Sequence, residues 1–192
     1  LDGWRYADIA TLARQAEGPD PYGLQAEFVE LVQHAARLSG ESTPAPVAKS
    51  AHLLGAKQGG QLLTAPSDPW LATNDGVERS VDSMLAGQEA VYAFQDERPA
   101  TFDSFTVLIN ESNQYHLKEF ELLVGDEGPT GTFRSIGTFT TQNLKMLKTP
   151  HQVFKFDPVT ARYLKVKLIS SHGGSGYVYA TEFQLFGELG ET

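Results

Sequence analysis

The stretch PVTARYLKVKLISSHGGSGYVYATEFQLF, residues 158–186, decides the fold because it contains two strand patterns joined by a glycine-rich loop. In the first pattern, one long strand, apolar side chains alternate with lysines, as in a strand with one buried face. The apolar side carries Leu164, Val166 and Leu168, and it also includes Arg162, whose guanidinium would need an acidic partner if buried. After the loop, a second strand continues the alternation through Tyr177, Tyr179, Thr181, Phe183 and Leu185. The stretch therefore predicts the closing strand pair of a β-sandwich.

Seven more strand candidates precede this pair, with turn signals such as Gly59-Gly60 and Asn74-Asp75-Gly76 between them. They cover residues 52–56, 61–64, 89–94, 103–109, 117–124, 133–139 and 153–156. Many short strands without helical periodicity between them favour an antiparallel arrangement. We therefore predict a mainly β fold, an antiparallel jelly-roll β-sandwich, over residues 50–190.

Residues 1–40 have helical periodicity instead, and they predict a short helical hairpin. In its second half, Leu24, Phe28, Leu31, Ala35 and Leu38 recur at steps of four and three. Residues 41–49 follow with the serine and proline content of a linker. Two short helices are too small to make a core alone, so the hairpin must pack on the sandwich, on another domain or on a partner.

Charge and composition argue against several classes of function. The chain has 192 residues with a formal net charge of −9 and no cluster of Lys and Arg, which disfavours nucleic acid as a partner. No apolar stretch approaches the roughly 20 residues of a transmembrane helix. There are no cysteines, and the chain begins at Leu1 without a signal-like segment, so we expect it to be part of a larger polypeptide.

Catalytic motifs are not recognisable in the sequence. The five histidines stand far apart, without the spacing of metal ligands, and no nucleophile or phosphate-binding motif occurs. We therefore expect that the protein is not an enzyme.

Several sequence motifs occur in an order that resembles discoidin domains. These are ATNDG at 72–76, EAVYAF at 89–94, TFDSFTVLI at 101–109, LKEFELLVG at 117–125 and the closing stretch. Discoidin domains, also called the coagulation factor V and VIII type C fold, are galactose-binding-like, and the resemblance extends from about residue 50 to 187. It implies a non-catalytic binding module outside the cytoplasm, extracellular, at the cell surface or periplasmic. The first function it implies is carbohydrate or surface-glycan binding and adhesion.

The hairpin has a resemblance of its own. The pattern YADIATLARQAEGPDPYGLQAEFVELVQHAARL is similar to the C-terminal segment of bacterial surface proteins that carry a von Willebrand factor A domain. This resemblance implies the alternative function, a structural or protein-interaction module within a larger surface protein. The partner is then a surface protein and not a glycan.

The discoidin resemblance also implies a structural Ca²⁺ in the loop that contains Asp75. The matching positions are Asp75, Ser80 and Glu182, whose oxygens suit a hard cation. Val77 occupies a position where the family frequently has a ligating side chain, so one oxygen is missing. In the alternative interpretation, residues 74–76 form only a turn and Glu182 pairs with a cation of the sandwich.

Carbohydrate binding needs an aromatic platform beside polar groups. Trp70, in the turn-rich sequence SDPW, is the candidate platform, and the polar candidates are Asp68, Tyr115, His116 and His172. The alternative is that Trp70 fills one end of the core. Tyr177 and Tyr179 are expected to pack on the sheet with their hydroxyls at its surface.

Overall fold

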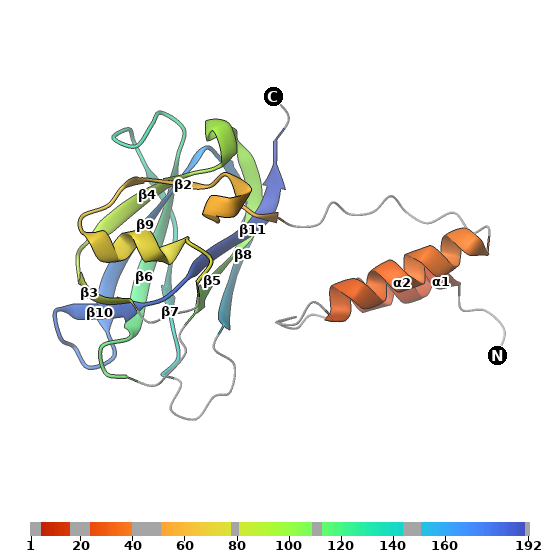
Figure 1. The fold of residues 1–192 in the computed structure, drawn as a ribbon, viewed down its shortest axis with the longest axis horizontal. Helices are drawn as coiled ribbons and strands as arrows, with labels where there is room; N and C mark the ends of the chain where they lie inside the picture. The colour runs from red at the N-terminus through yellow and green to blue at the C-terminus, as the bar shows by residue number, and fades with distance from the viewer. Residues whose placement is uncertain are drawn as a thin grey trace. The chain divides into compact units, whose positions relative to one another are not determined.

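A computed structural model describes residues 5–15, 24–39, 51–77, 81–108, 113–143 and 151–190 of the chain. It divides into two compact units, Leu1–Lys49 and Ser50–Thr192 (Figure 1). Each unit is therefore described separately.

The first unit contains the two predicted helices, α1 (Tyr6–Gln15) and α2 (Leu24–Leu38), which pack against each other. Asp8 stabilises the start of α1, since its carboxylate accepts hydrogen bonds from the backbone N–H and the guanidinium of Arg5. These bonds lower the pKa of Asp8. On α2, Val32 and Ala36 are buried. None of the described helices is long and apolar enough to span a membrane.

The second unit is an antiparallel β-sandwich, which confirms the predicted fold class (Figure 1). One sheet has the order β1-β11-β5-β8 and the other the order β2-β4-β9-β6-β7, while β10 pairs with β3 in a small third sheet. The first sheet consists of β1 (Ala51–His52), β11 (Phe183–Leu189), β5 (Ala100–Leu108) and β8 (His151–Ala161). The second consists of β2 (Gln61–Thr64), β4 (Glu89–Ala93), β9 (Tyr163–Ser171), β6 (Leu117–Gly125) and β7 (Arg134–Thr140). The third pairs β10 (Tyr177–Ala180) with β3 (Val81–Leu85), and three short 3-10 helices, η1 (Ala56–Gln58), η2 (Asp68–Thr73) and η3 (Gln95–Glu97), lie in the connections.

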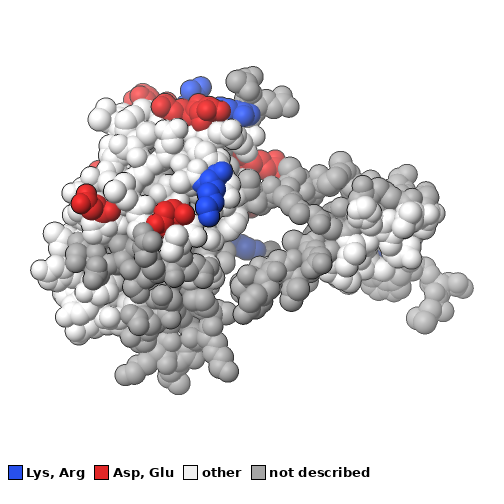
Figure 2. Space-filling model, in the orientation of Figure 1, with Lys and Arg blue, Asp and Glu red and all other residues white. Residues whose placement is uncertain are grey.

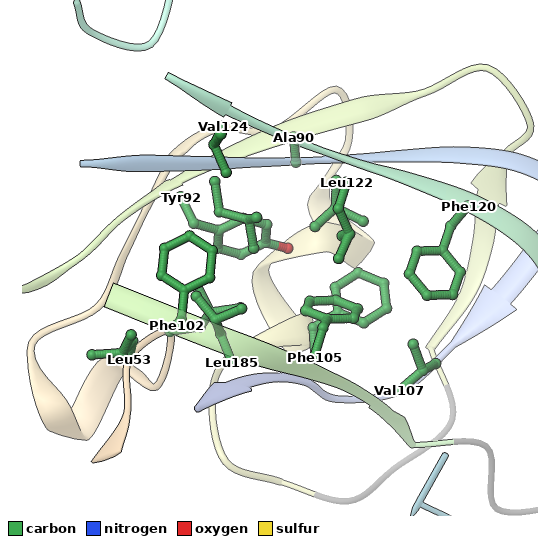
Figure 3. Packing of buried hydrophobic residues seen from close by; sticks show 14 of the residues in the cluster. Leu53, Ala90, Tyr92, Phe102, Phe105, Val107, Phe120, Leu122, Val124 and Leu185 are labelled. Carbon is green, nitrogen blue, oxygen red and sulfur yellow. The ribbon is translucent and has the colours of Figure 1, made fainter. Parts of the chain in front are cut away.

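The hydrophobic core lies between the two large sheets (Figure 3). Phe102, Phe105 and Leu185 enter it from the first sheet and meet Phe120 and Leu122 from the second. The rings of Phe105 and Phe120 lie 5.5 Å apart between centroids. Burying each such side chain contributes about 1.5–3 kcal/mol, so the phenylalanines account for much of the cohesion between the sheets.

The closing stretch crosses between the sheets, contrary to the prediction of one long strand. Residues up to Ala161 belong to β8 in the first sheet, and β9 begins at Tyr163 in the second. Arg162 lies at the crossing, exposed, and its backbone N–H donates to the carboxylate of Asp126 at 3.0 Å. The prediction that Arg162 shares the buried face is therefore wrong, because the strand period starts only after the crossing. The burial of Leu164, as of Val166 and Leu168, is confirmed.

The stretch after the glycine loop also divides. Tyr177 is exposed and Tyr179 half-buried in β10, whereas Phe183 and Leu185 are buried in β11. The expected single alternation is wrong because the chain leaves one sheet and joins another at Thr181 and Glu182. There, the hydroxyl of Thr181 donates to the carbonyl of Leu108, and the carbonyl of Glu182 accepts the Leu108 N–H at 3.0 Å. Because of these bonds, the alternation of buried and less buried side chains starts afresh in β11.

Candidate functional site

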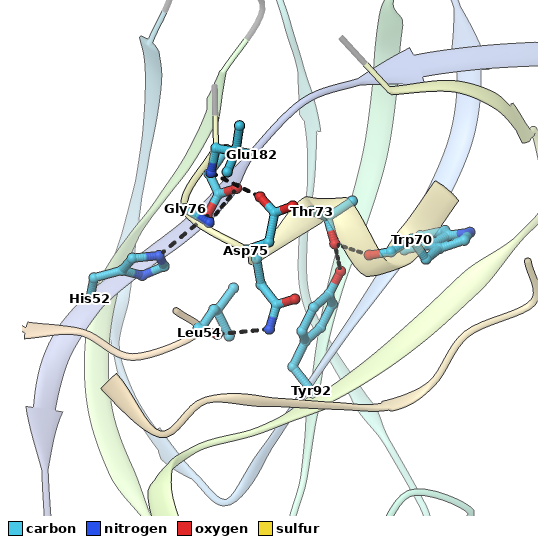
Figure 4. Close-up of polar contacts among 10 residues, drawn as sticks. His52, Leu54, Trp70, Thr73, Asp75, Gly76, Tyr92 and Glu182 are labelled. Atoms are coloured by element: carbon cyan, nitrogen blue, oxygen red, sulfur yellow. Dashed lines mark hydrogen bonds and ion pairs between the residues drawn. The ribbon is translucent and has the colours of Figure 1, made fainter. Parts of the chain in front are cut away.

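Glu182 is a buried carboxylate at the corner where β10 leads into β11. Its side chain is 1% exposed, and both of its oxygens accept the backbone N–H of Gly76, at 3.2 and 3.3 Å (Figure 4). Gly76 has φ of 76°, a left-handed conformation that favours glycine. The preceding Asp75 accepts the Val77 N–H at 2.8 Å, which closes the turn. The turn is therefore shaped so that its amide points at the buried carboxylate.

His52 lies on the other side of Glu182. Its Nε2 is 3.8 Å from a carboxylate oxygen, and its side chain is only 17% exposed. Sequence reasoning did not identify His52, because it stands 130 positions from Glu182 (182 minus 52) and only the pairing of β1 with β11 brings the two together. Residues 74–76 thus form a turn, as in the alternative interpretation. Its second part, that Glu182 pairs with a cation of the sandwich, stays a prediction, since the His52 ring at 3.8 Å makes no hydrogen bond to the carboxylate.

Behind the corner lies a buried hydrogen-bond network. The Thr73 hydroxyl donates to the carbonyl of Trp70 at 2.7 Å and lies 2.5 Å from the hydroxyl of Tyr92. Burial raises the pKa of Tyr92, so this phenol stays protonated and donates to Thr73. Asn74 donates from its amide to the carbonyl of Leu54 at 3.0 Å. These bonds fix the segment that carries Asp75 and Gly76.

The predicted calcium ligands only partly meet in this corner. Asp75 and Glu182 both border Gly76, but Ser80 lies outside the described residues. The Gly76 N–H donates to both Glu182 oxygens, and the positive end of this N–H bond would repel a cation. The Val77 side chain is apolar and cannot serve as a ligand. No group of three or more His, Cys, Asp or Glu suited to a metal occurs in the described part of the chain. The described residues form a hydrogen-bonded turn with a carboxylate on either side of Gly76, and calcium binding at this loop stays a prediction.

Trp70 is fully buried, so the expectation of an exposed platform there is wrong. Its ring lies 6.2 Å from that of Phe183, and its indole N–H donates to the side chain of Gln88 at 3.2 Å. The alternative, in which Trp70 fills one end of the core, describes the structure. Asp68 is exposed at the start of the same helix, η2, which packs against β3.

Three other predicted site residues come together where β6 begins and β9 ends. The His172 N–H donates to the carbonyl of His116 at 3.0 Å, and the Tyr179 N–H donates to that of Tyr115 at 2.7 Å. The rings of Tyr115 and Tyr179 lie 5.2 Å apart. His116 is itself buried, at 3% exposure, so it supports the cluster through its backbone and does not offer its ring to a ligand.

His172 is the polar side chain of this cluster. Its Nε2 lies 3.0 Å from the hydroxyl of Thr141, which donates its own proton to the carbonyl of Leu117. The hydroxyl therefore accepts the proton of Nε2, and Nδ1 is left as an acceptor. Burial, and secondly the charge of Lys118, lower the pKa of His172, so the imidazole is neutral at neutral pH.

Tyr177 extends the aromatic surface along β10. It is 54% exposed and pairs across the sheet with Leu85, which is also exposed. Tyr177 and Tyr179 stand two residues apart on a strand and so share a face. We call Tyr115, His172, Tyr177 and Tyr179 the tyrosine surface. The sequence analysis expected these two tyrosines to pack on the sheet with their hydroxyls at its surface, and it did not count them as site residues.

Charged side chains do not form a basic patch on the face of the molecule shown in Figure 2. The Lys and Arg side chains drawn there stand singly, with Asp and Glu side chains between them. The described interactions include the Lys165 ammonium, which bonds to Glu89 at 2.9 Å and lies over the ring of Phe133. The local charge pattern thus resembles a mixed surface, without the basic stripe that phosphate backbones require.

Comparisons with known sequences point to one family over part of the sandwich. The family model Sad1 / UNC-like C-terminal matches residues 102–189, which extend from β5 to β11. The SUN domain-containing protein 4 of Arabidopsis thaliana is 37% identical over 73 residues, 38% of this chain. The matched part spans only 12% of that protein. The family model does not reach the hairpin, whose resemblance to von Willebrand factor A proteins stays a prediction.

Comparisons with solved structures bear on the fold. The C-terminal domain of a chitobiase from Bacteroides fragilis has a TM-score of 0.57 at 15% identity and covers 73% of this chain and 100% of its own. The CBM32-5 module of GH89 from Clostridium perfringens, in complex with GalNAc-β-1,3-galactose, has a TM-score of 0.53 at 15% identity, covering 71% and 99%. The family 32 module of Clostridium perfringens NanJ, in complex with galactose, has 0.52 at 14%, covering 70% and 98%. At these identities the likeness shows the fold alone, a jelly-roll β-sandwich.

Proposed function

We propose that the sandwich is a non-catalytic module that binds carbohydrate through the tyrosine surface. The single observation that carries this proposal is the contact between the Tyr115 and Tyr179 rings, with the exposed Tyr177 two residues along the same face of β10. An aromatic ring offers a flat apolar face, and its hydroxyl offers a polar edge. A sugar ring, which has C–H groups on one face and hydroxyls around its rim, matches both.

His172 adds orientation to this surface. Its neutral imidazole presents Nδ1 as an acceptor for a sugar hydroxyl, while Thr141 holds the other ring nitrogen. The loop that carries His172 is fixed by the bond from Gly173 N–H to the Gln114 carbonyl, at 2.6 Å. A fixed polar group next to an apolar platform is the usual composition of a small-ligand site.

The structural neighbours support the same ligand class. Two of them contain galactose or GalNAc-β-1,3-galactose in their crystals. Galactose and N-acetylgalactosamine are therefore the first sugars to try. Binding of one sugar to such an open surface falls near the millimolar range, about −4 kcal/mol. An extracytoplasmic location, where glycans are displayed, belongs to this proposal.

Isothermal titration calorimetry of the full chain with a panel of sugars tests the proposal. We expect Tyr177→Ala and Tyr179→Ala each to weaken binding about tenfold, equivalent to about 1.4 kcal/mol. Tyr6→Ala is the matched control, since Tyr6 is also exposed but lies on α1. Equal affinity in all three variants, or no binding of any sugar by the wild type, would overturn the proposal.

A second candidate function is protein binding, and the match to the Sad1 / UNC-like C-terminal model is the observation that favours it. The same tyrosine surface would then receive a protein partner. Cross-linking from a photoreactive residue at position 177 separates the two functions. Cross-links to a specific protein, together with calorimetry that shows no sugar binding, would support this second function.

A further inference from the structure

Lys118 is a half-buried lysine beside the tyrosine surface. It is the second residue of β6, and the Thr141 N–H donates to its carbonyl at 2.8 Å. Thr141 is also the residue whose hydroxyl lies 3.0 Å from the His172 ring. The charge of Lys118 reaches that ring, since it contributes, after burial, to the lowered pKa of His172. Lys118 therefore adds a cation to a surface that otherwise offers aromatic rings and a neutral imidazole.

A β-bulge places Lys118 at this position. The partner of Leu117 on β9 is Ser171. The partner of Glu119 is Ser170, so two steps along β6 correspond to one step along β9. Lys118 is the extra residue of the bulge. Such a bulge changes the direction of a side chain, and bulges are frequent beside functional sites. Lys118 is thus outside the regular alternation of its strand.

No carboxylate of the described residues pairs with the Lys118 ammonium. The neighbouring Glu119 accepts a hydrogen bond from Ser170 at 2.7 Å. The Lys165 ammonium, by contrast, has Glu89 at 2.9 Å. A partly desolvated cation gains from an anionic partner, and an anionic group of a ligand would supply one. The net charge of −9 does not prevent this, because charges more than about 8 Å away are largely screened at physiological ionic strength.

His172 and Lys118 require different groups of a ligand. Nδ1 of the neutral His172 ring accepts, so it requires a hydroxyl that donates. An ammonium has donors only, so Lys118 requires an acceptor and binds a charged one more strongly. The loop after His172 leaves space for a ligand, since a Cβ at Gly174 or Gly176 would meet no other part of the protein within 4 Å. A sugar with hydroxyls and one acidic group fits both side chains.

We propose that the tyrosine surface selects acidic sugars, with Lys118 bound to the carboxylate or sulfate of the sugar and His172 to one of its hydroxyls. This inference rests on the proposed carbohydrate binding and adds the class of sugar. An ion pair at a partly exposed site should make the acidic sugar bind about fivefold more tightly than its neutral counterpart, equivalent to about 1 kcal/mol.

Calorimetry of the full chain with galactose, galacturonic acid and galactose 6-sulfate tests this selection, since the three sugars differ only in the group at one carbon. We expect at least one acidic sugar to bind about fivefold more tightly than galactose at low ionic strength. The advantage should disappear at about 1 M salt, where the screening length is about 3 Å. A gain with only one acidic sugar identifies the anionic group as carboxylate or sulfate. Equal affinities for all three would overturn this inference and leave the proposed function intact, whereas no binding of any sugar would overturn both.

Substitutions at Lys118 test whether this residue is the cation. In Lys118→Gln the acidic and neutral sugars should bind equally, while Lys118→Arg, which keeps the charge, should retain the preference. Lys167→Gln is the matched control, because Lys167 is likewise half-buried in the same sheet but has Glu89 and Glu121 as its cross-strand partners. It should keep the full preference. A preference that survives Lys118→Gln, or that Lys167→Gln removes to the same extent, would contradict the assignment.

Discussion

Replacing Glu182 by glutamine tests how the buried carboxylate is held. Glutamine keeps the shape and one accepting oxygen for the Gly76 N–H but removes the charge. A hydrogen bond to a charged group contributes about 1.5–3 kcal/mol and one between neutral groups about 0.5–1.5 kcal/mol. We therefore expect Glu182→Gln to lower the free energy of unfolding by about 1 to 1.5 kcal/mol. The loss arises from the weaker bond to the Gly76 N–H.

Urea unfolding followed by circular dichroism measures this difference. Glu188→Gln is the control, because Glu188 lies on the same strand, β11, but is exposed, and we expect it to change stability by no more than about 0.5 kcal/mol. Both proteins are compared with and without calcium. A metal held by Glu182 would add about 2.7 kcal/mol to the wild type at a hundredfold excess over its dissociation constant. We expect no such gain. A calcium-dependent gain that Glu182→Gln abolishes would refute this expectation and support the calcium site.

Two further changes follow from the same structure. Trp70→Phe should fold and bind sugar as the wild type does, because Trp70 lies inside the core. The lost bond to Gln88 should lower the free energy of unfolding by about 1 kcal/mol. Calorimetry measures the sugar affinity and urea unfolding the stability, and a loss of binding without a loss of stability would contradict the core assignment. Burial, and secondly the charge of Lys118, lower the pKa of His172 in the folded chain below its ordinary value, so protonation favours unfolding and the melting temperature should fall as pH drops from that ordinary value toward the lowered one. His172→Gln should remove this part of the pH dependence, and an unchanged slope would argue against the neutral imidazole.

The fold was largely predictable because burial follows periodicity. Leu164, Val166 and Leu168 are buried as their alternation in the sequence indicated. The crossing at Arg162 could not be predicted, because a single residue carries the chain from one sheet to the other and leaves no gap in the alternation. Strand β3 was missed since its sequence, VDSML, has neither aromatic residues nor a clear alternation.

The candidate site was harder to predict because distant segments build it. Tyr115 and His172 were identified as candidates, since both stand in or beside turn-rich loops, and the structure brings them together. Trp70 was named as a platform because a proline turn is typical of a surface connection, but its ring packs inward onto Phe183, as the core-filling alternative expected. The pairing of His52 with Glu182 depends on β1 and β11, and no local pattern reports it.

The central claim is that the tyrosine surface binds sugar, and chemical-shift mapping tests it most directly. The labelled full chain is titrated with galactose and N-acetylgalactosamine up to tens of millimolar, about ten times the expected dissociation constant. We predict saturable shifts confined to residues 113–117, 141 and 171–179, which surround the tyrosine surface. Shifts centred on residues 74–77 and 182, or none with any sugar of the panel, would contradict the account.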